Sequence, residues 1–316
     1  MASARSADAS PHVPIMVAEV LRHLRPSPDD VAVDCTLGGG GHALAILDRV
    51  MPGGRFLGLD VDPGALGLAE ARIRAAGHGP DTATVVHADF RRLPTVMDAA
   101  GMTAANLVLV DLGVSAMQHD TPARGFSYKH PGPLDLRMDQ TTGVPAWQRL
   151  ASFDRDALAA VLTANADEPH ADLLARLIVE RRPETTHALE RLIRVGLRGA
   201  LPDLPRADVK MSIRRTFQAL RILVNDEFAA LDELLRVLPS CLRPGARAVF
   251  LTFHSGEDRR VKNALREGLR AGTYATIADT VVRSAKAETF ANRRAASAKL
   301  SCMARMSIRS NTSFTT

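Results

Sequence analysis

The stretch DCTLGGGGHALAI, residues 34–46, joins an apolar run to a helical pattern through four consecutive glycines. The run VAVDC, residues 31–35, has the length and composition of a short buried strand, and alanine and leucine recur at helical spacing after His42. A glycine turn between a first strand and a helix is typical of open parallel sheets, where it lets ligand atoms approach the backbone. The stretch therefore predicts an α/β fold with a ligand site at residues 38–41. The alternative is an ordinary tight turn.

Strands and helices alternate in the same way along most of the chain. Residues 226–242 again have helical spacing, and RPGARAVFLTFHS, residues 243–255, returns to a strand near residue 246. Between residues 119 and 211 only helical stretches separated by prolines occur. Such alternation predicts a parallel sheet with helices on both faces, interrupted by an all-helical insertion. The other predicted strands are FLGLD (56–60), ATVVHAD (83–89) and LVLVDLG (107–113), with helices near 42–50, 64–77, 154–164, 169–181 and 185–198.

This pattern divides the chain into four parts. The first ten residues are small and polar, which is typical of a disordered tail rather than of a secretory signal. The predicted parts are the tail at 1–10, the first half of the sheet domain at 11–118, the helical insertion at 119–211, and the second half with a basic C-terminal segment at 212–316.

Composition narrows the class of protein. The chain of 316 residues carries a formal charge of +5, and arginine, which grips phosphate groups through two parallel hydrogen bonds, supplies most of the basic residues. Residues 259–316 hold twelve Arg or Lys against three Asp or Glu, so we expect a nucleic-acid surface, with solvated helix faces as the alternative. Three widely spaced cysteines predict neither disulfides nor a zinc site and indicate a cytosolic protein. No apolar run is long enough to span a bilayer.

Acidic residues at the predicted strand ends indicate the kind of cofactor. Gly38, Gly40 and Ala43 match the loose dinucleotide pattern G-x-G-x-x-A, and Asp60 follows at the distance of a ribose ligand. Asp34, however, precedes the glycines and would repel a pyrophosphate, and Asp111 adds a third carboxylate at the same sheet edge. S-adenosylmethionine brings a sulfonium and an amino group instead of phosphates. The three acids therefore favour S-adenosylmethionine over a nicotinamide dinucleotide.

Longer motifs occur along nearly the whole chain. In order, they are HVPIMVAEVL (12–21), DCTLGGGGHA (34–43), LDVDP (59–63), HADF (87–90), LVDLGVSAMQ (109–118), RGFSYKHPGPLDLRMD (124–139), RRTFQALRILVNDE (214–227) and FHSGEDRRVK (253–262). Together they closely resemble the bacterial ribosomal-RNA small-subunit methyltransferase H family, also called MraW. The resemblance implies a Rossmann-like class I S-adenosylmethionine-dependent methyltransferase with an inserted helical domain.

The resemblance also implies an activity and a set of cofactor contacts. Members of this family methylate the exocyclic N4 of a decoding-site cytidine in 16S ribosomal RNA, so small-subunit ribosomal RNA is the expected partner. We expect no membrane partner and no metal, and a monomer or homodimer. The cofactor contacts implied by the family fall on Gly40, Gly41, His42, Asp60, Phe90, Asp111 and Gln118, beside Asp34 from the argument above.

Methyl transfer to a cytosine amine needs an acceptor for its proton, because the nitrogen lone pair is delocalised into the ring. Asp111 is the first candidate, since it lies next to the expected methyl donor; alternatively, it only orients the cofactor. Asp135 and Asp139 are the next candidates, with Arg137 between them suited to a phosphate or base edge. The alternative for these three residues is a salt-bridged loop.

The remaining expected site residues contact RNA. A base that reacts must leave its stack, and Phe126, Tyr128 and His130 are expected to stack on it or replace it, with His254 lining the base pocket. The alternatives to this activity are a non-catalytic ribosome-assembly factor that binds the cofactor and a methyltransferase for another RNA cytidine. The cations expected on the RNA backbone, unless they pair with nearby acids, are Arg214, Arg215, Arg221, Arg259, Arg260 and Lys262.

Overall fold

The computed structural model describes residues 14–278 and 280–307, which form two compact units. The first unit comprises residues up to Gly113, Leu235–His254 and the chain from Val261 onward; the second comprises Val114–Leu234 and Ser255–Arg260. The tail predicted at 1–10 and residues 308–316 of the basic segment lie outside the described residues.

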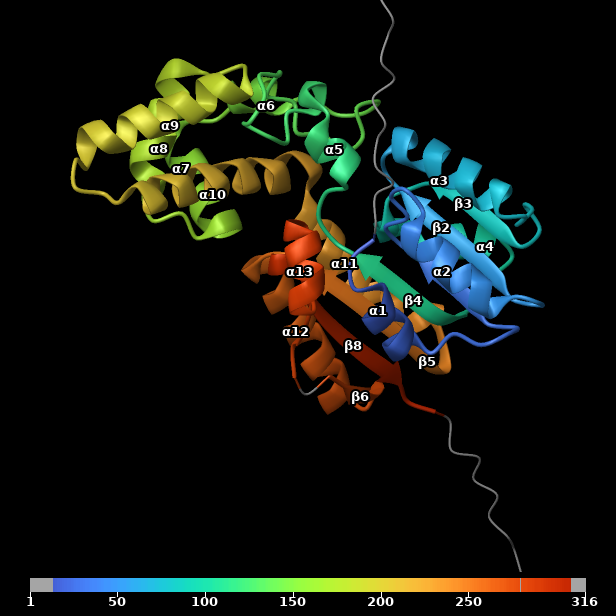
Figure 1. Ribbon diagram of the computed structural model, residues 1–316. Coiled ribbons are helices and arrows are strands. Elements are labelled where there is room, and N and C mark those ends of the chain that lie inside the picture. The colour runs from blue at the N-terminus through green and yellow to red at the C-terminus, as the bar shows by residue number, and fades with distance from the viewer. Residues whose placement is uncertain (1–13, 279, 308–316) are drawn as a thin grey trace, which may run out of the picture. The chain divides into compact units, whose positions relative to one another are not determined.

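The first unit is built on a mixed sheet, seen in Figure 1. Its described strands follow the order β3-β2-β1-β4-β5-β8-β6, with the short β7 also paired to β8. The first five strands of this path are parallel, and β8 is antiparallel to β5, β6 and β7. The strands are β1 Val31–Asp34, β2 Arg55–Asp60, β3 Ala83–His87, β4 Ala105–Asp111, β5 Leu242–Thr252, β6 Tyr274–Ile277, β7 Val282–Arg283 and β8 Lys299–Arg305.

The predicted α/β fold is confirmed, and the predicted parallel strands are extended by antiparallel ones. The antiparallel pairing comes from β8, whose sequence KLSCMAR lies in the basic C-terminal segment. Its leucine and methionine are buried and pair in register with β5, so the strand covers an edge that β5 would otherwise expose. The predicted Pro-Gly turn lies within β5, at the register shift between Leu242 and Arg247.

Helices α1, α2 and α3 cover one face of the sheet through a shared apolar core. Asp62 caps α3 by accepting hydrogen bonds from two backbone amides, and Pro63 occupies the first turn, where a missing N–H costs nothing. The bounds of the first unit's helices are α1 Val17–Leu24, α2 Gly41–Val50, α3 Pro63–Ala75, η1 Phe90–Arg92, α4 Leu93–Ala99, α13 Lys286–Ala291 and η3 Arg293–Ser297. Helices α11 Glu227–Cys241 and α12 Ser255–Arg270 run from one unit into the other.

The second unit is helical, as predicted for the insertion, and has its own apolar core. The predicted end of the insertion at residue 211 falls inside α10. Val209, Ile213 and Phe217 of that helix are buried in the helical core, so α10 as a whole belongs to the second unit. The described helices of this unit are α5 Ala116–Asp120, η2 Pro122–Arg124, α6 Ala146–Leu150, α7 Arg155–Ala166, α8 Ala171–Arg181, α9 Thr186–Ala200 and α10 Arg206–Asn225.

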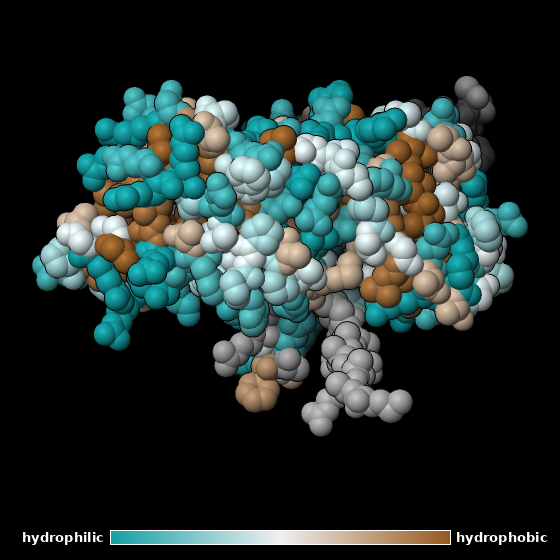
Figure 2. Space-filling model, turned by 90° about the horizontal axis from the view of Figure 1, so that it is seen from above, coloured by the Kyte–Doolittle hydropathy of each residue, from teal (hydrophilic) through white to brown (hydrophobic). Residues whose placement is uncertain are grey.

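The surface seen in Figure 2 is mostly hydrophilic, with hydrophobic residues gathered in separate patches. Among the described residues, no helix has both the length and the apolar character needed to cross a bilayer.

Candidate active site

Three carboxylates gather at the carboxyl end of the parallel strands. Asp34 is the last residue of β1, and its partners in the sheet are Gly58 of β2 and Leu109 of β4. Asp60 and Asp111 lie two residues beyond those partners, so all three side chains emerge on the same face of the sheet. The strand order reverses between β1 and β4, and open α/β sheets bind ligands at such a point.

These acids lie in an environment that disfavours their charge. Asp34 is only 1% exposed, and burial raises its pKa to about 7, with Asp111 and Asp60 adding repulsion and His42 and the Thr36 amide opposing the rise. Burial also raises the pKa of Asp60, although the amides of Asp62 and Gly38 donate to its carboxylate at 2.9 and 2.7 Å. A cation placed among these carboxylates relieves this cost.

His42 links the acids to the N-terminal segment. Its Nε2 lies 2.8 Å from the carbonyl oxygen of Ile15, and its Nδ1 lies 3.6 Å from Asp111 Oδ2. A carbonyl only accepts hydrogen bonds, so Nε2 carries a proton and Nδ1 faces Asp111. Burial lowers the pKa of His42, with Asp34 opposing, which favours the neutral ring with an unprotonated Nδ1. The Thr36 hydroxyl accepts a hydrogen bond from the Asp111 backbone amide at 2.6 Å.

The glycine run leaves little room for side chains. A Cβ on Gly40 would lie 3.2 Å from Ala69 of α3, and Gly40 also has φ of +78°, which a side chain disfavours. A Cβ on Gly39 would lie 3.3 Å from the Arg72 guanidinium, and one on Gly41 would lie 2.8 Å from the Pro14 ring. A Cβ on Gly38 would meet only an ordinary contact, but φ of +50° at Gly38 favours glycine, and its amide orients Asp60.

Phe90 begins η1 after β3 and is partly exposed, so it is not a fully buried core residue. The neighbouring Asp89 caps that turn by accepting from the Arg91 amide at 2.8 Å, and it also accepts from the Arg91 guanidinium at 2.8 and 3.0 Å. His254, the last residue of its segment in the first unit, is partly buried.

The second unit holds most of the other predicted site residues. Phe126 is 8% exposed and lies in the helical core, and Tyr128 is partly buried against that core, with its ring centroid 5.4 Å from that of Phe217. These contacts support a packing role for both rings, and their stacking on a target base stays a prediction. His130 is exposed. Gln118 closes a capping box with Ser115 at the start of α5, and its predicted contact with the cofactor stays a prediction.

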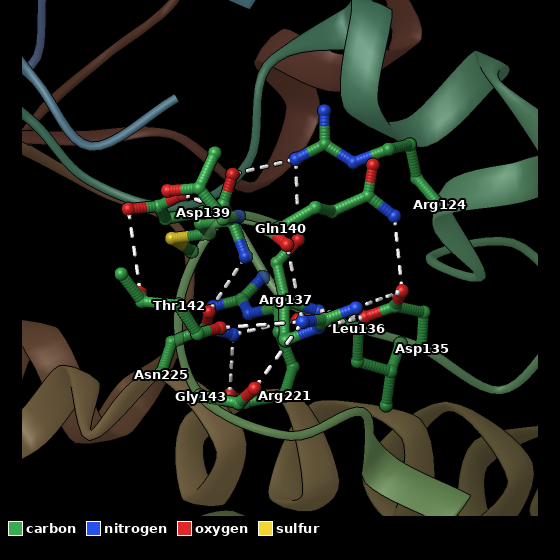
Figure 3. A network of polar contacts seen from close by, with 12 residues as sticks. Arg124, Asp135, Leu136, Arg137, Asp139, Gln140, Thr142, Gly143, Arg221 and Asn225 are labelled. Carbon is green, nitrogen blue, oxygen red and sulfur yellow. Dashed lines mark hydrogen bonds and ion pairs between the residues drawn. The ribbon is translucent and has the colours of Figure 1, made fainter. Parts of the chain in front are cut away.

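The loop PLDLRMD is held by the polar network of Figure 3. Arg137 donates to both carboxylate oxygens of Asp135 at 2.7 and 3.0 Å, and Gln140 donates to the same carboxylate at 2.9 Å. Burial raises the pKa of Asp135, but these hydrogen bonds outweigh it and hold the pKa below its ordinary value. Asp139 accepts from the amide and hydroxyl of Thr141 at 2.8 and 2.6 Å.

The salt-bridged alternative is thus the one observed for this loop. A carboxylate with a lowered pKa is a weak base, which favours a role for Asp135 in ordering the loop over its predicted role as proton acceptor. The catalytic roles of Asp135 and Asp139 stay predictions. Arg137 is likewise not available to a phosphate, because it also donates to three carbonyl oxygens of the loop. The side-chain amide of Asn225 in α10 also holds this loop, as Figure 3 shows. It donates a hydrogen bond to the Leu136 carbonyl oxygen and accepts one from the Met138 amide, each at 2.7 Å.

The predicted RNA-binding cations divide by exposure. The side chain of Arg221 is 15% exposed, donates to Glu227 at 2.7 and 2.8 Å and lies 3.8 Å from Glu257. The expected alternative, pairing with nearby acids, is therefore the one observed, and contact of Arg221 with RNA stays a prediction. Arg260 pairs with Asp232 at 2.9 Å and lies over the Phe228 ring at 4.2 Å. Three cations present more of their side chains to solvent: Arg214 is exposed, Arg215 is partly exposed, and Arg259 is exposed within 3.5 Å of Asp167.

Comparison with known proteins places this geometry in a family. The model of the MraW methylase family matches residues 9–306. The chain belongs to the MraW methylase family. It is 40% identical over 298 residues to ribosomal RNA small subunit methyltransferase H 1 of Agathobacter rectalis, covering 92% of this chain and 84% of that protein. It is 38% identical over 314 residues to ribosomal RNA small subunit methyltransferase H of Symbiobacterium thermophilum, covering 93% and 96%.

A solved rRNA methylase from Streptococcus thermophilus is also similar, with 10% identity, a TM-score of 0.41 and 92% of each chain covered. The family assignment confirms the predicted methyltransferase class and, with it, S-adenosylmethionine as the methyl donor. The sheet edge that carries Asp34, Asp60 and Asp111, called the acid edge below, fits that cofactor. Three carboxylates lie close together there, one of them with a pKa of about 7, and a cationic group would stabilise their ionised forms.

Three site residues of this MraW methylase were missed at the level of sequence. Thr36 orients both Asp34 and Asp111, and Asp62 is buried while it caps α3 and orients Asp60. The capping role of Asp62 could have been predicted from the sequence, because Asp-Pro before a stretch of helical spacing is typical of a helix start. Glu288 accepts a hydrogen bond from the Met16 amide, which lies 272 residues away in the sequence, and no local sequence pattern predicts such a contact.

Proposed function

We propose that this MraW methylase transfers the methyl group of S-adenosylmethionine to N4 of a decoding-site cytidine in 16S ribosomal RNA. The observation that carries the proposal is the set of Asp34, Asp60 and Asp111 on one face of the sheet at the carboxyl ends of β1, β2 and β4. The names of the relatives support ribosomal RNA of the small subunit as the substrate class. A cytosolic location and a monomeric or dimeric state stay predictions.

Each acid has a role that its surroundings suit. Asp60, oriented by two backbone amides, is placed to accept hydrogen bonds from ribose hydroxyls. Asp34 supplies negative charge beside the sulfonium and amino groups, and Phe90 is the candidate for contact with the adenine ring. When bound, S-adenosylmethionine supplies an electrophilic methyl group. The geometry of the pocket then has to align the amine with that group, which is the main source of rate for such a displacement.

Asp111 is the proposed proton acceptor. As the N4 lone pair forms its bond to the methyl carbon, the bond from that carbon to sulfur breaks and sulfur keeps the electron pair. The nitrogen becomes positively charged and must lose a proton, which a carboxylate at this position accepts. His42 Nδ1, 3.6 Å from Asp111, offers a second position for the same proton. This pairing distinguishes Asp111 from Asp135, whose carboxylate is held by Arg137 and Gln140.

The test is transfer of labelled methyl from S-adenosylmethionine to small ribosomal subunits that lack this modification, with the product nucleoside identified by mass spectrometry. We expect N4-methylcytidine at a single site. Naked ribosomal RNA is assayed in parallel to separate substrate from assembly state. Cofactor binding without transfer to either substrate would instead support a cofactor-binding assembly factor, and a methylated cytidine elsewhere would correct the target.

A further inference from the structure

The short helix α13 lies in the first unit, at the end of the sheet toward which the β4 arrow points in Figure 1. Its Glu288 is partly buried and uses both carboxylate oxygens. Oε1 accepts a hydrogen bond from the Met16 amide at 2.6 Å, and Oε2 accepts from the Ser284 hydroxyl at 2.7 Å. Glu288 therefore joins the C-terminal part of the unit to the segment that precedes α1.

The amide that Glu288 holds belongs to the same peptide group that holds His42. The Met16 N–H and the Ile15 carbonyl are the two ends of one planar, resonance-stabilised peptide. The carbonyl accepts from His42 Nε2 at 2.8 Å while the amide donates to Glu288 at 2.6 Å. A carboxylate on the amide side polarises the peptide and increases the negative charge on its carbonyl oxygen, which strengthens the second hydrogen bond.

The backbone around this peptide is in an uncommon conformation. Met16 is 1% exposed and has φ of +54°, in the left-handed region that residues other than glycine seldom adopt. Such a conformation persists only when its surroundings hold it. The hydrogen bond from Met16 to Glu288 is one such restraint, and burial of the Met16 side chain in the core with Ile15 is another.

We propose that Glu288 is a positioning residue for methyl transfer, which fixes the Ile15–Met16 peptide and through it holds His42 with Nδ1 toward Asp111. The proposal rests on the proposed function, since it assigns Asp111 and His42 to the reacting proton. Charged groups that act on His42 in the described structure are Asp111, Asp34 and Glu288. Glu288 acts on the ring from the side opposite to Asp111, through the peptide.

The proposal is tested with Glu288→Ala, Glu288→Asp and Glu288→Gln. Alanine removes the acceptor, and aspartate keeps the charge but is one methylene too short to reach the Met16 amide in place. Glutamine keeps the length and an acceptor oxygen. Because a misplacement of about 1 Å costs up to roughly a hundredfold in rate, we expect kcat to fall about tenfold or more in the Ala and Asp variants. We expect glutamine to restore kcat to within about threefold, and KM for S-adenosylmethionine to change less than kcat.

A second readout does not depend on activity. In protein labelled with ¹⁵N-histidine, the His42 signals should report the Nε2–H form in the wild type and in Glu288→Gln, and a mixture of ring forms in Glu288→Asp and Glu288→Ala. The matched control is Glu267→Ala on α12, which removes an exposed glutamate of the same unit and should change neither readout.

The outcomes separate this proposal from the proposed function. Wild-type kcat in Glu288→Asp and Glu288→Ala overturns the positioning role while methyl transfer stands. A lowered kcat with unchanged His42 signals overturns the route through His42. Absence of transfer by the wild-type protein contradicts the proposed function, and the His42 signals then decide alone whether Glu288 holds the ring. If Glu288→Ala does not fold, Glu288→Asp carries the test.

Discussion

The buried carboxylate of Asp34 predicts that cofactor binding depends on pH. Burial raises its pKa to about 7, so near neutrality about half of the molecules carry a proton on this carboxylate. A bound cation favours the ionised form and releases that proton. We therefore expect affinity for S-adenosylmethionine to rise with pH from about 6 to 8, by at most about tenfold per unit below the pKa.

Isothermal titration calorimetry in two buffers of different ionisation enthalpy measures both the affinity and the released proton. Asp34→Asn keeps the size of the side chain and removes its titration, so the part of the pH dependence due to Asp34 should vanish in this variant. An equal pH slope in both proteins would show that another group titrates.

We expect Asp111 to affect the rate of methyl transfer more than the binding of S-adenosylmethionine. Asp111→Asn keeps the shape of the side chain but loses its capacity to take a proton, and removal of a general base typically costs about 10²–10⁴-fold. We expect kcat to fall within that range while the dissociation constant for S-adenosylmethionine changes less than tenfold. Single-turnover methyl transfer and calorimetry measure the two quantities. Asp98→Asn, on the exposed side of α4, is the matched control, and wild-type turnover in Asp111→Asn would end its role as acceptor.

At the scale of one element, α10 carries two arginines in different environments, the paired Arg221 and the exposed Arg214. Arg221 is largely buried and pairs with Glu227 and Glu257, so its removal takes away the cation that compensates these two carboxylates. We expect Arg221→Ala to lower the free energy of unfolding by about 3–5 kcal/mol. Arg214 lies exposed on the same helix, so Arg214→Ala should change stability by no more than about 0.5 kcal/mol.

RNA binding should show the reverse order. Loss of one phosphate contact reduces the slope of log affinity against log salt by about 1, and this is the result expected for Arg214→Ala. Arg221→Ala, measured at a temperature where it remains folded, should keep the wild-type slope. Urea unfolding and filter binding at several salt concentrations provide the data. If only Arg221→Ala changed the slope of log affinity against log salt, Arg221 and not Arg214 would be the residue that contacts RNA.

On the scale of the whole molecule, the second unit has what an independent domain needs. Residues 114–234 contain a separate apolar core and a chain length typical of single domains. We expect this fragment to fold alone with one cooperative urea transition, because Arg221 keeps its partner Glu227 even without Glu257. It should bind RNA in a salt-dependent way and fail to bind S-adenosylmethionine, since the acid edge belongs to the first unit. Lack of a cooperative transition would contradict its independence.

Sequence patterns were sufficient where local spacing determines structure. Short apolar strands, the glycine turn and the acids at strand ends predicted the α/β order and the edge that holds Asp34, Asp60 and Asp111, because parallel strands end at one edge whatever lies between them. The patterns did not show that Phe126 lies in the helical core or that Arg221 pairs with Glu227 and Glu257. An aromatic or a cation looks the same in sequence whether it faces solvent or a partner, and only the fold supplies that partner.

The sequence by itself therefore determined the class of fold, the acidic cofactor edge and the motifs of the MraW methylase family, all of which depend on residues close together in the chain. Tertiary structure alone decided which charged side chains pair with each other, how β8 completes the sheet and why Gly40 and Gly41 lack side chains. It also brought Glu288 to the peptide that holds His42. These contacts join distant segments, and burial and hydrogen-bond geometry exist only once those segments have packed.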